Sequence, residues 1–302
     1  MAIKITTPRL TPITVKEMVS FPDNSQYLDK LRYSHYQTEE MELVASRLRA
    51  LAANRQHILQ TIITELQQPS GFQFRNKGQS QSFVLHRSEN YTLRLMLWIP
   101  DGHQARSIPF SYEGVHDHFF DLMSVGLFGP GYRTSLYSFD RHETIRRYDG
   151  LTRLNYHGDM WLQEGEVIYY YANEDVHLQH PPASLSLSLN LIIIKSDTSP
   201  SQTIFDLDGP ADNKVVWGRP RFNSRQKFNT QRSIFSTMLK HGDADSRHTV
   251  LQIALESELE EVRALLAWVA LLKCPSPEPR WYEELAKEKS TFVRDIVTMG
   301  QQ

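Results

Sequence analysis

The feature of this sequence that most restricts its fold is an alternation with period two between about residues 72 and 196. In Tyr91-Thr-Leu-Arg-Leu-Met-Leu-Trp98, three leucines fall on one face and Thr92, Arg94, Met96 and Trp98 on the other. Residues 124–137, 165–171 and 183–194 have the composition of further strands, separated by Gly, Pro and Asp turns. Side chains of a strand point alternately to its two faces, and no helical pattern interrupts these segments. The sequence therefore predicts a β-sandwich or barrel.

The last of these segments has one leucine face and one uncharged polar face. Its polar face consists of Ser184, Ser186, Ser188 and Asn190. An outer strand face would be expected to carry charged residues, so this face is typical of the wall of a wet internal pocket. Ser186, Ser188 and Asn190 are accordingly predicted to contact a substrate.

Helical patterns flank the β region. Apolar residues recur at three- and four-residue spacings in residues 39–66, and again in residues 233–239, 249–272 and 278–298. Residues 199–227 are rich in Pro, Gly, Asp and Asn. We therefore predict a mainly β protein with helical flanks. Its regions are an N-terminal helical region (1–70), a β-barrel with the functional site (71–198), a linker or loop (199–229) and a C-terminal helical region (230–302).

The composition limits the partners and the metal ligands that the protein can use. The 302 residues include 33 basic and 35 acidic ones, 12 histidines and a single cysteine. A net charge of −2 gives no electrostatic footprint for nucleic acid. One cysteine excludes an internal disulfide and any cysteine-rich metal site, which leaves imidazole as the only abundant nitrogen or sulfur ligand. The first residues lack the apolar core of a secretory signal, and no apolar run is long enough to span a bilayer. We expect a cytoplasmic protein with no membrane partner.

Two histidines carry the clearest chemical signal. In Gly114-Val-His116-Asp-His118 they are two residues apart, so on a strand both point to one face and can reach one metal ion. A third ligand is expected from residues 165–190, which contain His177 and His180 in a predicted loop. We favour His177, with His180 as the alternative. Asp121 is the candidate catalytic carboxylate, able to hydrogen-bond a ligand or the substrate, although a turn or surface role is equally compatible with the sequence.

These segments resemble a known family. Leu95-Met-Leu-Trp98-Ile-Pro-Asp-Gly102, followed by Gly114-Val-His-Asp-His118, resembles the first metal motif of the cupin superfamily, and within it the cysteine (thiol) dioxygenases. The resemblance covers about residues 80–195. It implies a cupin-type β-barrel (a double-stranded β-helix) in which His116, His118 and His177 surround one Fe(II). It also implies an arginine for the substrate carboxylate, either Arg87 or Arg94.

The sequence departs from the family pattern at several positions. Leu122 stands where the usual cupin motif has a glutamate, so a three-histidine site is implied without a fourth carboxylate ligand. Met123 stands near the position where some thiol dioxygenases carry a cysteine crosslinked to tyrosine. The histidine–tyrosine pair of the family's last strand has no counterpart here. The resemblance therefore does not identify a thiol as the substrate.

The predicted function is that of a mononuclear non-heme iron oxygenase. Its partners would be O₂ and a small polar substrate, such as an amino acid or a related metabolite, and assembly into a homo-oligomer is compatible with the helical flanks. Two alternatives remain open, because imidazole suits several divalent metals. One is a metal-dependent isomerase, lyase or hydrolase on the same barrel, with the metal as Lewis acid. The other is a non-catalytic ligand-binding cupin.

Overall fold

The computed structural model describes most of the chain and divides it into two compact units. The described residues are 1–8, 10–20, 24–33, 38–67, 82–100, 112, 114–140, 151–195, 202–208, 215–221, 226–257, 260–273, 278–288, 293–294 and 297–298. Unit 1 comprises Met1–Ser138, Leu154–Ser199 and Pro210–Val216, and unit 2 comprises Phe139–Arg153, Pro200–Gly209 and Trp217–Gln302. Each unit has its own hydrophobic core.

Unit 1 begins with a strand and four helices. The helices are α1 (Val15–Val19), α2 (Asn24–Tyr33), α3 (Thr38–Ala52) and α4 (Arg55–Leu66). The helical pattern of residues 39–66 thus belongs to two helices, not to a continuous one. Asn54 separates them, because its side chain accepts a hydrogen bond from the backbone N–H of His57 and so caps the start of α4.

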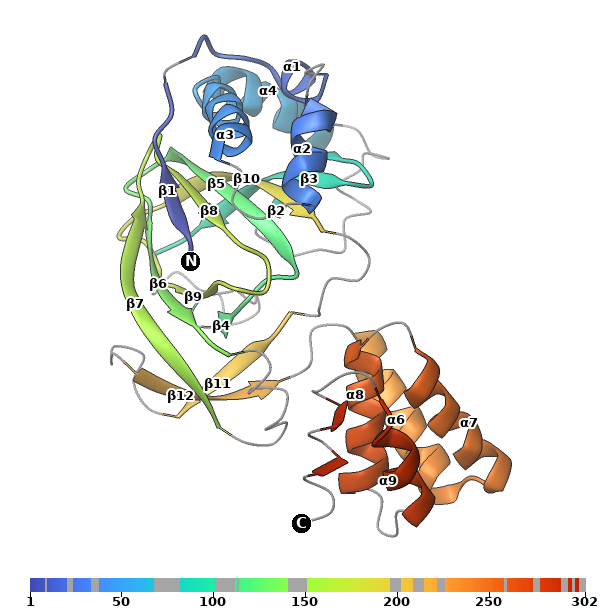
Figure 1. Ribbon diagram of the computed structural model, residues 1–302. Helices are drawn as coiled ribbons and strands as arrows, with labels where there is room; N and C mark the ends of the chain where they lie inside the picture. Colours follow the sequence, from blue (N-terminus) through green and yellow to red (C-terminus); the bar gives the residue numbers. More distant parts are fainter. Residues whose placement is uncertain are drawn as a thin grey trace. The chain divides into compact units, whose positions relative to one another are not determined.

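Two antiparallel sheets form the body of unit 1 (Figure 1). The first has the order β1-β8-β5-β10-β3-β2. Its strands are β1 (Ile3–Ile5), β8 (Val167–Tyr170), β5 (Phe120–Phe128), β10 (Ser186–Ile194), β3 (Tyr91–Trp98) and β2 (Ser82–Arg87). In the second sheet β4 (Val115–His116) pairs with β9 (Val176–Gln179), β9 with β6 (Tyr132–Ser138), and β6 with β7 (Thr152–Leu162). This is the mainly β, cupin-type barrel with helical flanks that the sequence predicts.

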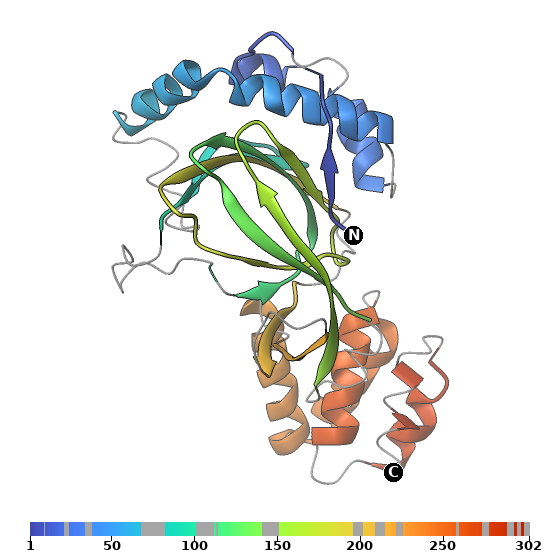
Figure 2. The same ribbon diagram turned by 90° about the vertical axis from the view of Figure 1, so that its left-hand side faces the viewer.

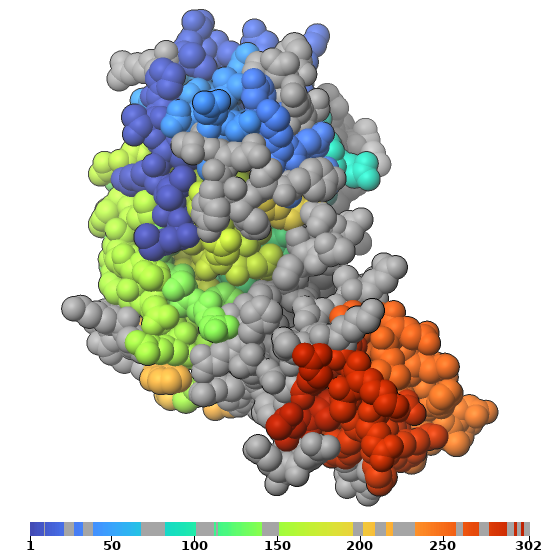
Figure 3. Space-filling model, in the orientation of Figure 1, coloured from blue at the N-terminus to red at the C-terminus, as the bar shows by residue number. Residues whose placement is uncertain are grey.

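The predicted strand at residues 124–137 is two strands. Gly129 and Gly131 have φ angles of +84° and +79°, a region that L side chains rarely adopt, and they turn the chain between β5 and β6. The N-terminal strand β1 pairs with β8, and in the space-filling view its dark-blue atoms run along the outside of the barrel (Figure 3).

The two faces of the first sheet have different environments. The helices α1–α4 cover one face (Figure 2), where a core cluster joins them to Leu93, Leu95, Met123, Leu189 and Leu191. The opposite face turns into the barrel and carries the polar side chains of β10, which are almost completely buried. The separation of leucines from serines on β10 is therefore confirmed, and the helical layer explains why the leucine face is apolar.

Unit 2 contains an antiparallel strand pair and a group of packed helices. The region predicted as a linker forms the antiparallel pair β11 (Ile204–Asp208) and β12 (Val215–Arg221). Its Pro, Gly and Asp residues obscured two short runs of β-branched and aromatic residues, which suit strands. The helical elements are α6 (Gln226–His241), α7 (Ala244–Glu256), α8 (Glu260–Trp268), the π-helix η2 (Val269–Lys273) and α9 (Pro279–Leu285). Across the described ranges, no helix has both the length and the apolar character needed to cross a bilayer.

Candidate metal centre

Three histidines meet in unit 1. His116 on β4 lies directly opposite His177 on β9, and His118 follows in the segment between β4 and β5. Each ring offers one nitrogen within 4.8 Å of the nitrogens offered by the other two. The ring centroids are 4.5 Å apart for His116 and His177, 5.0 Å for His116 and His118, and 4.7 Å for His118 and His177. These three side chains form the cluster that can hold one metal ion.

Their local structure differs from the sequence prediction in two respects. His118 lies just outside strand β4, although the argument from spacing placed both residues of the His-x-His pair on a strand. His177 lies on strand β9, although a loop was predicted there. The histidines meet because of strand register: the antiparallel pairing of β4 and β9 places His177 opposite His116.

The ring nitrogens have few protein partners. Nδ1 of His116 lies 2.8 Å from the backbone oxygen of Gly114, which can only accept, so Nδ1 carries the proton and Nε2 has the free lone pair. Nδ1 of His118 and both nitrogens of His177 are buried and have no hydrogen-bond partner among the described residues. Leaving buried polar atoms unpaired is costly, so this arrangement fits a ligand that the nitrogens themselves bind.

Burial also favours the form that binds metals. It lowers the pKa of His116 and lowers the pKa values of His118 and His177 well below the ordinary value. The neighbouring histidines lower the pKa of His118 and of His177 further, since adjacent imidazolium charges would repel. All three rings are therefore neutral near pH 7, as metal ligation requires, and nitrogen donors suit iron, copper, nickel and zinc.

His180, the alternative third ligand, lies outside this cluster. Its Nε2 is 2.7 Å from the Ser135 hydroxyl, and its Nδ1 is 3.1 Å from a guanidinium nitrogen of Arg133. His177 pairs with Leu136 in the same ladder, so Arg133 and Ser135 occupy the other face of β6. The structure thus brings together His116, His118 and His177, and it places His180 on the opposite side of the sheet.

Asp121, the candidate catalytic carboxylate, points away from the histidines. It pairs across the sheet with Ile193, whose side chain packs among the helices. Its carboxylate accepts hydrogen bonds from the Tyr169 hydroxyl at 2.6 Å and the Ala172 backbone N–H at 2.7 Å, and it pairs with Lys195. With its oxygens engaged on the outer face of β5, Asp121 does not reach the barrel interior, so the sequence assignment as a catalytic group is corrected.

Of the two candidate arginines, Arg94 faces the interior. It lies opposite Asn190 in the sheet register, and its charge contributes to lowering the pKa of His118. Its Nε is buried without a hydrogen-bond partner, and burial lowers the pKa of its guanidinium to about 10, so it stays charged at pH 7. Arg87 ends strand β2 and is exposed.

Three residues of the predicted polar face, Ser186, Ser188 and Asn190, are buried on β10, whereas Ser184 precedes the strand and is exposed. Ser188 accepts a hydrogen bond from Nε1 of Trp98 at 2.9 Å and donates to the side-chain oxygen of Asn190 at 2.9 Å. Ser186 accepts from the backbone N–H of Gly131 at 3.1 Å and so holds the turn between β5 and β6. The barrel wall opposite Met96 and Arg94 therefore includes Ser188 and Asn190, while Ser186 makes a structural hydrogen bond.

Four hydroxyl groups of the interior were missed by the sequence argument. Ser124, Thr134, Tyr132 and Tyr170 are buried together, with the hydroxyls of Ser124 and Tyr170 interacting with that of Tyr132 and the Thr134 hydroxyl interacting with that of Tyr170. The ring of Tyr170 lies 4.9 Å from that of His177, and burial raises the pKa values of Tyr132 and Tyr170. Ser124 and Thr134 lie in predicted strand sequence, but apolar residues occur on both faces of residues 120–128 and 132–138. The alternation therefore does not show which face is inside.

Comparison with known proteins gives distant structural likenesses. No protein-family model matches the chain, and no curated protein matches it. DMSP lyase DddQ from Ruegeria pomeroyi aligns at 12% identity over 66% of this chain and 80% of that one, with a TM-score of 0.28. Hydroquinone 1,2-dioxygenase from a Sphingomonas species, with 4-hydroxybenzoate bound, aligns at 9% identity over 40% and 70%, with a TM-score of 0.28.

A third structure, of the DMSP lyases RdDddP and RnDddQII, aligns at 14% identity over 37% of this chain, with a TM-score of 0.23. The aligned region spans 46% of that chain, less than half of its length. Likenesses at this distance leave the function to be inferred from the site itself.

Proposed function

We propose that this protein is a mononuclear non-heme iron oxygenase that acts on a small polar substrate bearing a carboxylate, such as an amino acid or a related metabolite. The observation that carries the proposal is the cluster of three neutral imidazoles, in which nitrogens of His118 and His177 have no partner among the described residues, together with Arg94, whose buried Nε also lacks one. Fe(II) bound by three protein ligands would retain open positions and supply the activation of O₂. The choice of iron follows the cupin-like motif at residues 95–118.

His116, His118 and His177 would hold the ion. The hydrogen bond from His116 Nδ1 to the Gly114 oxygen fixes the tautomer and leaves the lone pair of Nε2 free to bind the ion. The stacked contact of His118 with Phe120, at a centroid distance of 4.5 Å, restricts the rotation of its ring. The protein thus presents the ligands in one arrangement before an ion binds.

Arg94 would anchor the substrate. Burying the Nε–H of Arg94 without an acceptor among the described residues is unfavourable, and a substrate carboxylate would supply that acceptor through charge-assisted hydrogen bonds. Arg94 faces the same interior as His118, and Asn190 stands opposite it on the next strand. A small molecule held by its carboxylate at Arg94 would therefore place its remaining atoms toward the histidines.

The interior tyrosines would supply hydrogen bonds. Burial keeps Tyr132 and Tyr170 protonated, so each hydroxyl can donate to an oxygen of the substrate. Tyr170 lies against His177, which puts its hydroxyl in the same interior as the candidate ligands. Trp98, packed at 4.2 Å against Tyr132, adds an apolar surface to the same part of the wall.

Metal content tests the proposal directly. Purified protein analysed by elemental mass spectrometry should carry about one iron per chain. His118→Ala and His177→Ala should lose it, because each removes one of three ligands. His180→Ala is the matched control and should keep the iron, since His180 contacts Ser135 and Arg133 instead. Absence of metal from the wild type, even after reconstitution with Fe(II), would contradict the metal centre.

A second measurement separates oxygenase from Lewis-acid chemistry. The ferrous protein should form a nitric oxide adduct detectable by electron paramagnetic resonance, and a panel of small carboxylates should contain one that stimulates O₂ uptake. A stoichiometric metal with neither response would instead indicate an isomerase, lyase or hydrolase on the same barrel.

A further inference from the structure

The segment between β8 and β9 connects two of the three histidines. Its residues 171–175 form a tight turn, with Asn173 in the left-handed region at φ 60°. The N–H of Asn173 donates to the backbone oxygen of His118 at 2.7 Å, and the chain continues through Val176 into His177. The turn therefore contacts the backbone of one histidine and leads directly into the next, so its position sets the distance between them.

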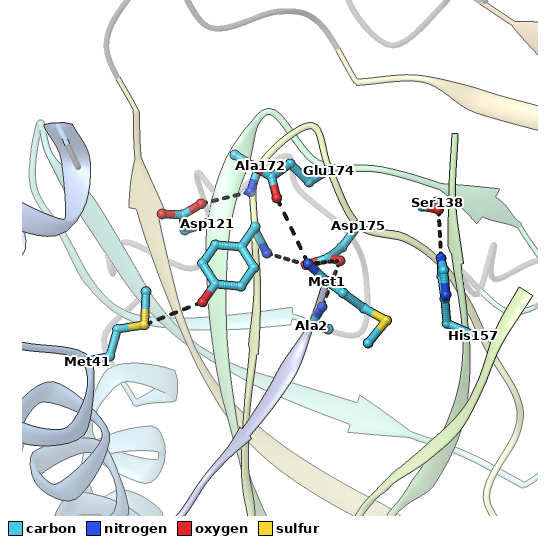
Figure 4. A network of polar contacts seen from close by, with 10 residues as sticks. Met1, Ala2, Met41, Asp121, Ser138, His157, Ala172, Glu174 and Asp175 are labelled. Atoms are coloured by element: carbon cyan, nitrogen blue, oxygen red, sulfur yellow. Dashed lines mark hydrogen bonds and ion pairs between the residues drawn. The ribbon is translucent and has the colours of Figure 1, made fainter. Parts of the chain in front are cut away.

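A carboxylate outside the barrel holds this turn. Asp121 accepts the N–H of Ala172 at 2.7 Å, the peptide just before Asn173 (Figure 4). The hydroxyl of Tyr169, at the other end of the same strand-to-turn segment, donates to its second oxygen at 2.6 Å. Asp175 closes the turn by accepting the N–H of Tyr171 at 2.6 Å.

The same carboxylate is tied to the helical layer. Lys195 pairs with Asp121 and donates to the backbone oxygen of Leu31 on α2 at 2.6 Å. Both charges are buried, with side-chain exposures of 1% for Asp121 and 9% for Lys195. Arg32 adds a second bond from α2, to the backbone oxygen of Ile194 at 2.8 Å. A continuous series of polar contacts thus runs from α2 through Lys195 and Asp121 to the turn.

A buried ion pair is a costly way to stabilise a fold, because a well-packed apolar pair often serves as well or better. Hydrogen bonds are directional, however. Those accepted by Asp121 hold the N–H of Ala172 and the hydroxyl of Tyr169 at fixed positions. Apolar contacts between the sheet and the helices would leave the turn free to shift along the sheet.

We infer that Asp121 is a positioning residue for the histidine cluster, acting through the turn at residues 171–175 with Lys195 as its charge partner. This inference rests on the proposed metal centre. It assigns Asp121 an indirect role, since its carboxylate lies on the helical side of β5 and touches none of the ligands. It also gives the N-terminal helices a part in the site, because α2 holds Lys195.

Cobalt binding tests the inference without any knowledge of the substrate. Apo-protein is titrated with Co(II), whose visible absorption spectrum reports ligand number and geometry. Asp121→Asn should weaken Co(II) binding by roughly ten- to hundredfold, the range typical when groups supporting metal ligands are removed, and should change the d–d bands. Glu288→Gln, which breaks the partly buried pair with Arg263 in unit 2, is the matched control and should leave affinity and spectrum unchanged.

The outcomes are distinguishable. If the wild type binds no Co(II), the metal centre itself is wrong and the inference is overturned with it. If the wild type binds and Asp121→Asn binds equally well with the same spectrum, only the positioning role is overturned. Should Asp121→Asn fail to fold, Tyr169→Phe decides, because it removes one hydrogen bond to Asp121 without leaving a buried charge. It should weaken binding by a smaller factor of a few fold, and unchanged binding would overturn the inference.

Discussion

His116 and His177 face each other across a single antiparallel step between β4 and β9, with ring centroids 4.5 Å apart. His177 is fully buried and His116 is partly buried, so neither ring can carry a charge without losing solvation and repelling the other. The cluster they form with His118 is therefore neutral in the folded protein and titrates near its ordinary value once unfolded.

This difference predicts a pH dependence of stability. The pKa values of the three histidines are lower in the folded protein than the usual value of 6.5. The unfolded chain therefore binds more protons, so the stabilisation is complete above about pH 6.5 and is lost as pH falls toward the folded pKa values. Each histidine contributes roughly 1.4 kcal/mol per pH unit in that window. Urea unfolding of metal-free protein between pH 5 and 7.5 measures the slope.

The double variant His118→Gln/His177→Gln is the control for this slope. Glutamine does not titrate, so the variant should lose most of the pH dependence between pH 5 and 6.5. An equal slope in both proteins would show that other groups are responsible.

Replacing Arg94 should stabilise the protein, although most substitutions lower the free energy of unfolding. Its guanidinium lines the barrel, and its buried Nε lacks a partner among the residues described. Replacing Arg94 by Met removes the cost of burying this charge while retaining much of the side chain's volume. We expect the free energy of unfolding to rise by about 1 kcal/mol, as often occurs when a residue kept for function is replaced.

Arg87→Met is the matched control, since Arg87 is exposed and its replacement should change stability by less than about 0.5 kcal/mol. Chemical denaturation of the three proteins, without ligand, makes the comparison. Destabilisation of Arg94→Met by 1 kcal/mol or more would show that the guanidinium serves the fold and would weaken its assignment as a substrate anchor.

The barrel and most of its site could be predicted from the sequence because both follow from the alternation of side chains along strands. Alternation on residues 91–98 and 183–194 identifies which side chains share a face, and Arg94, Ser188 and Asn190 do face the interior. Asp121 was misassigned because residues 120–128 are apolar on both faces, so the pattern does not show which face is inside. The choice between His177 and His180 depended on strand register, which is fixed by pairing between distant segments and not by local spacing.

The ion pair of Asp121 and Lys195 should show strong thermodynamic coupling. Removing one partner leaves the other charge buried and unpaired, so Asp121→Asn and Lys195→Met should each lower the free energy of unfolding by about 3 kcal/mol or more. The double variant leaves no buried charge and should be much less destabilised than the sum of the two. A double-mutant cycle by urea unfolding measures the coupling energy, and additive single effects would contradict a direct pair.

Gly126 offers a purely steric prediction. It lies on β5, its N–H donates to the backbone oxygen of Glu166, and its oxygen accepts from the N–H of Gly165. A Cβ on Gly126 would lie 2.0 Å from the backbone oxygen of Gln163, and a backbone atom cannot rotate away as a side chain can. Gly126→Ala must therefore displace the turn before β8, and we expect it to cost roughly 3 kcal/mol of stability.

Gly114→Ala is the matched comparison, because a Cβ there would meet no atom within 4 Å. Its effect should stay within about 0.5 kcal/mol, and the Gly114 oxygen remains available to His116. Since β8 leads into the turn before His177, the displaced turn in Gly126→Ala should also reduce Co(II) affinity, whereas Gly114→Ala should bind like the wild type. Equal unfolding free energies for the two variants would show that the β5–β8 connection yields to a methyl group, and the rigidity assigned to this end of the barrel would then be wrong.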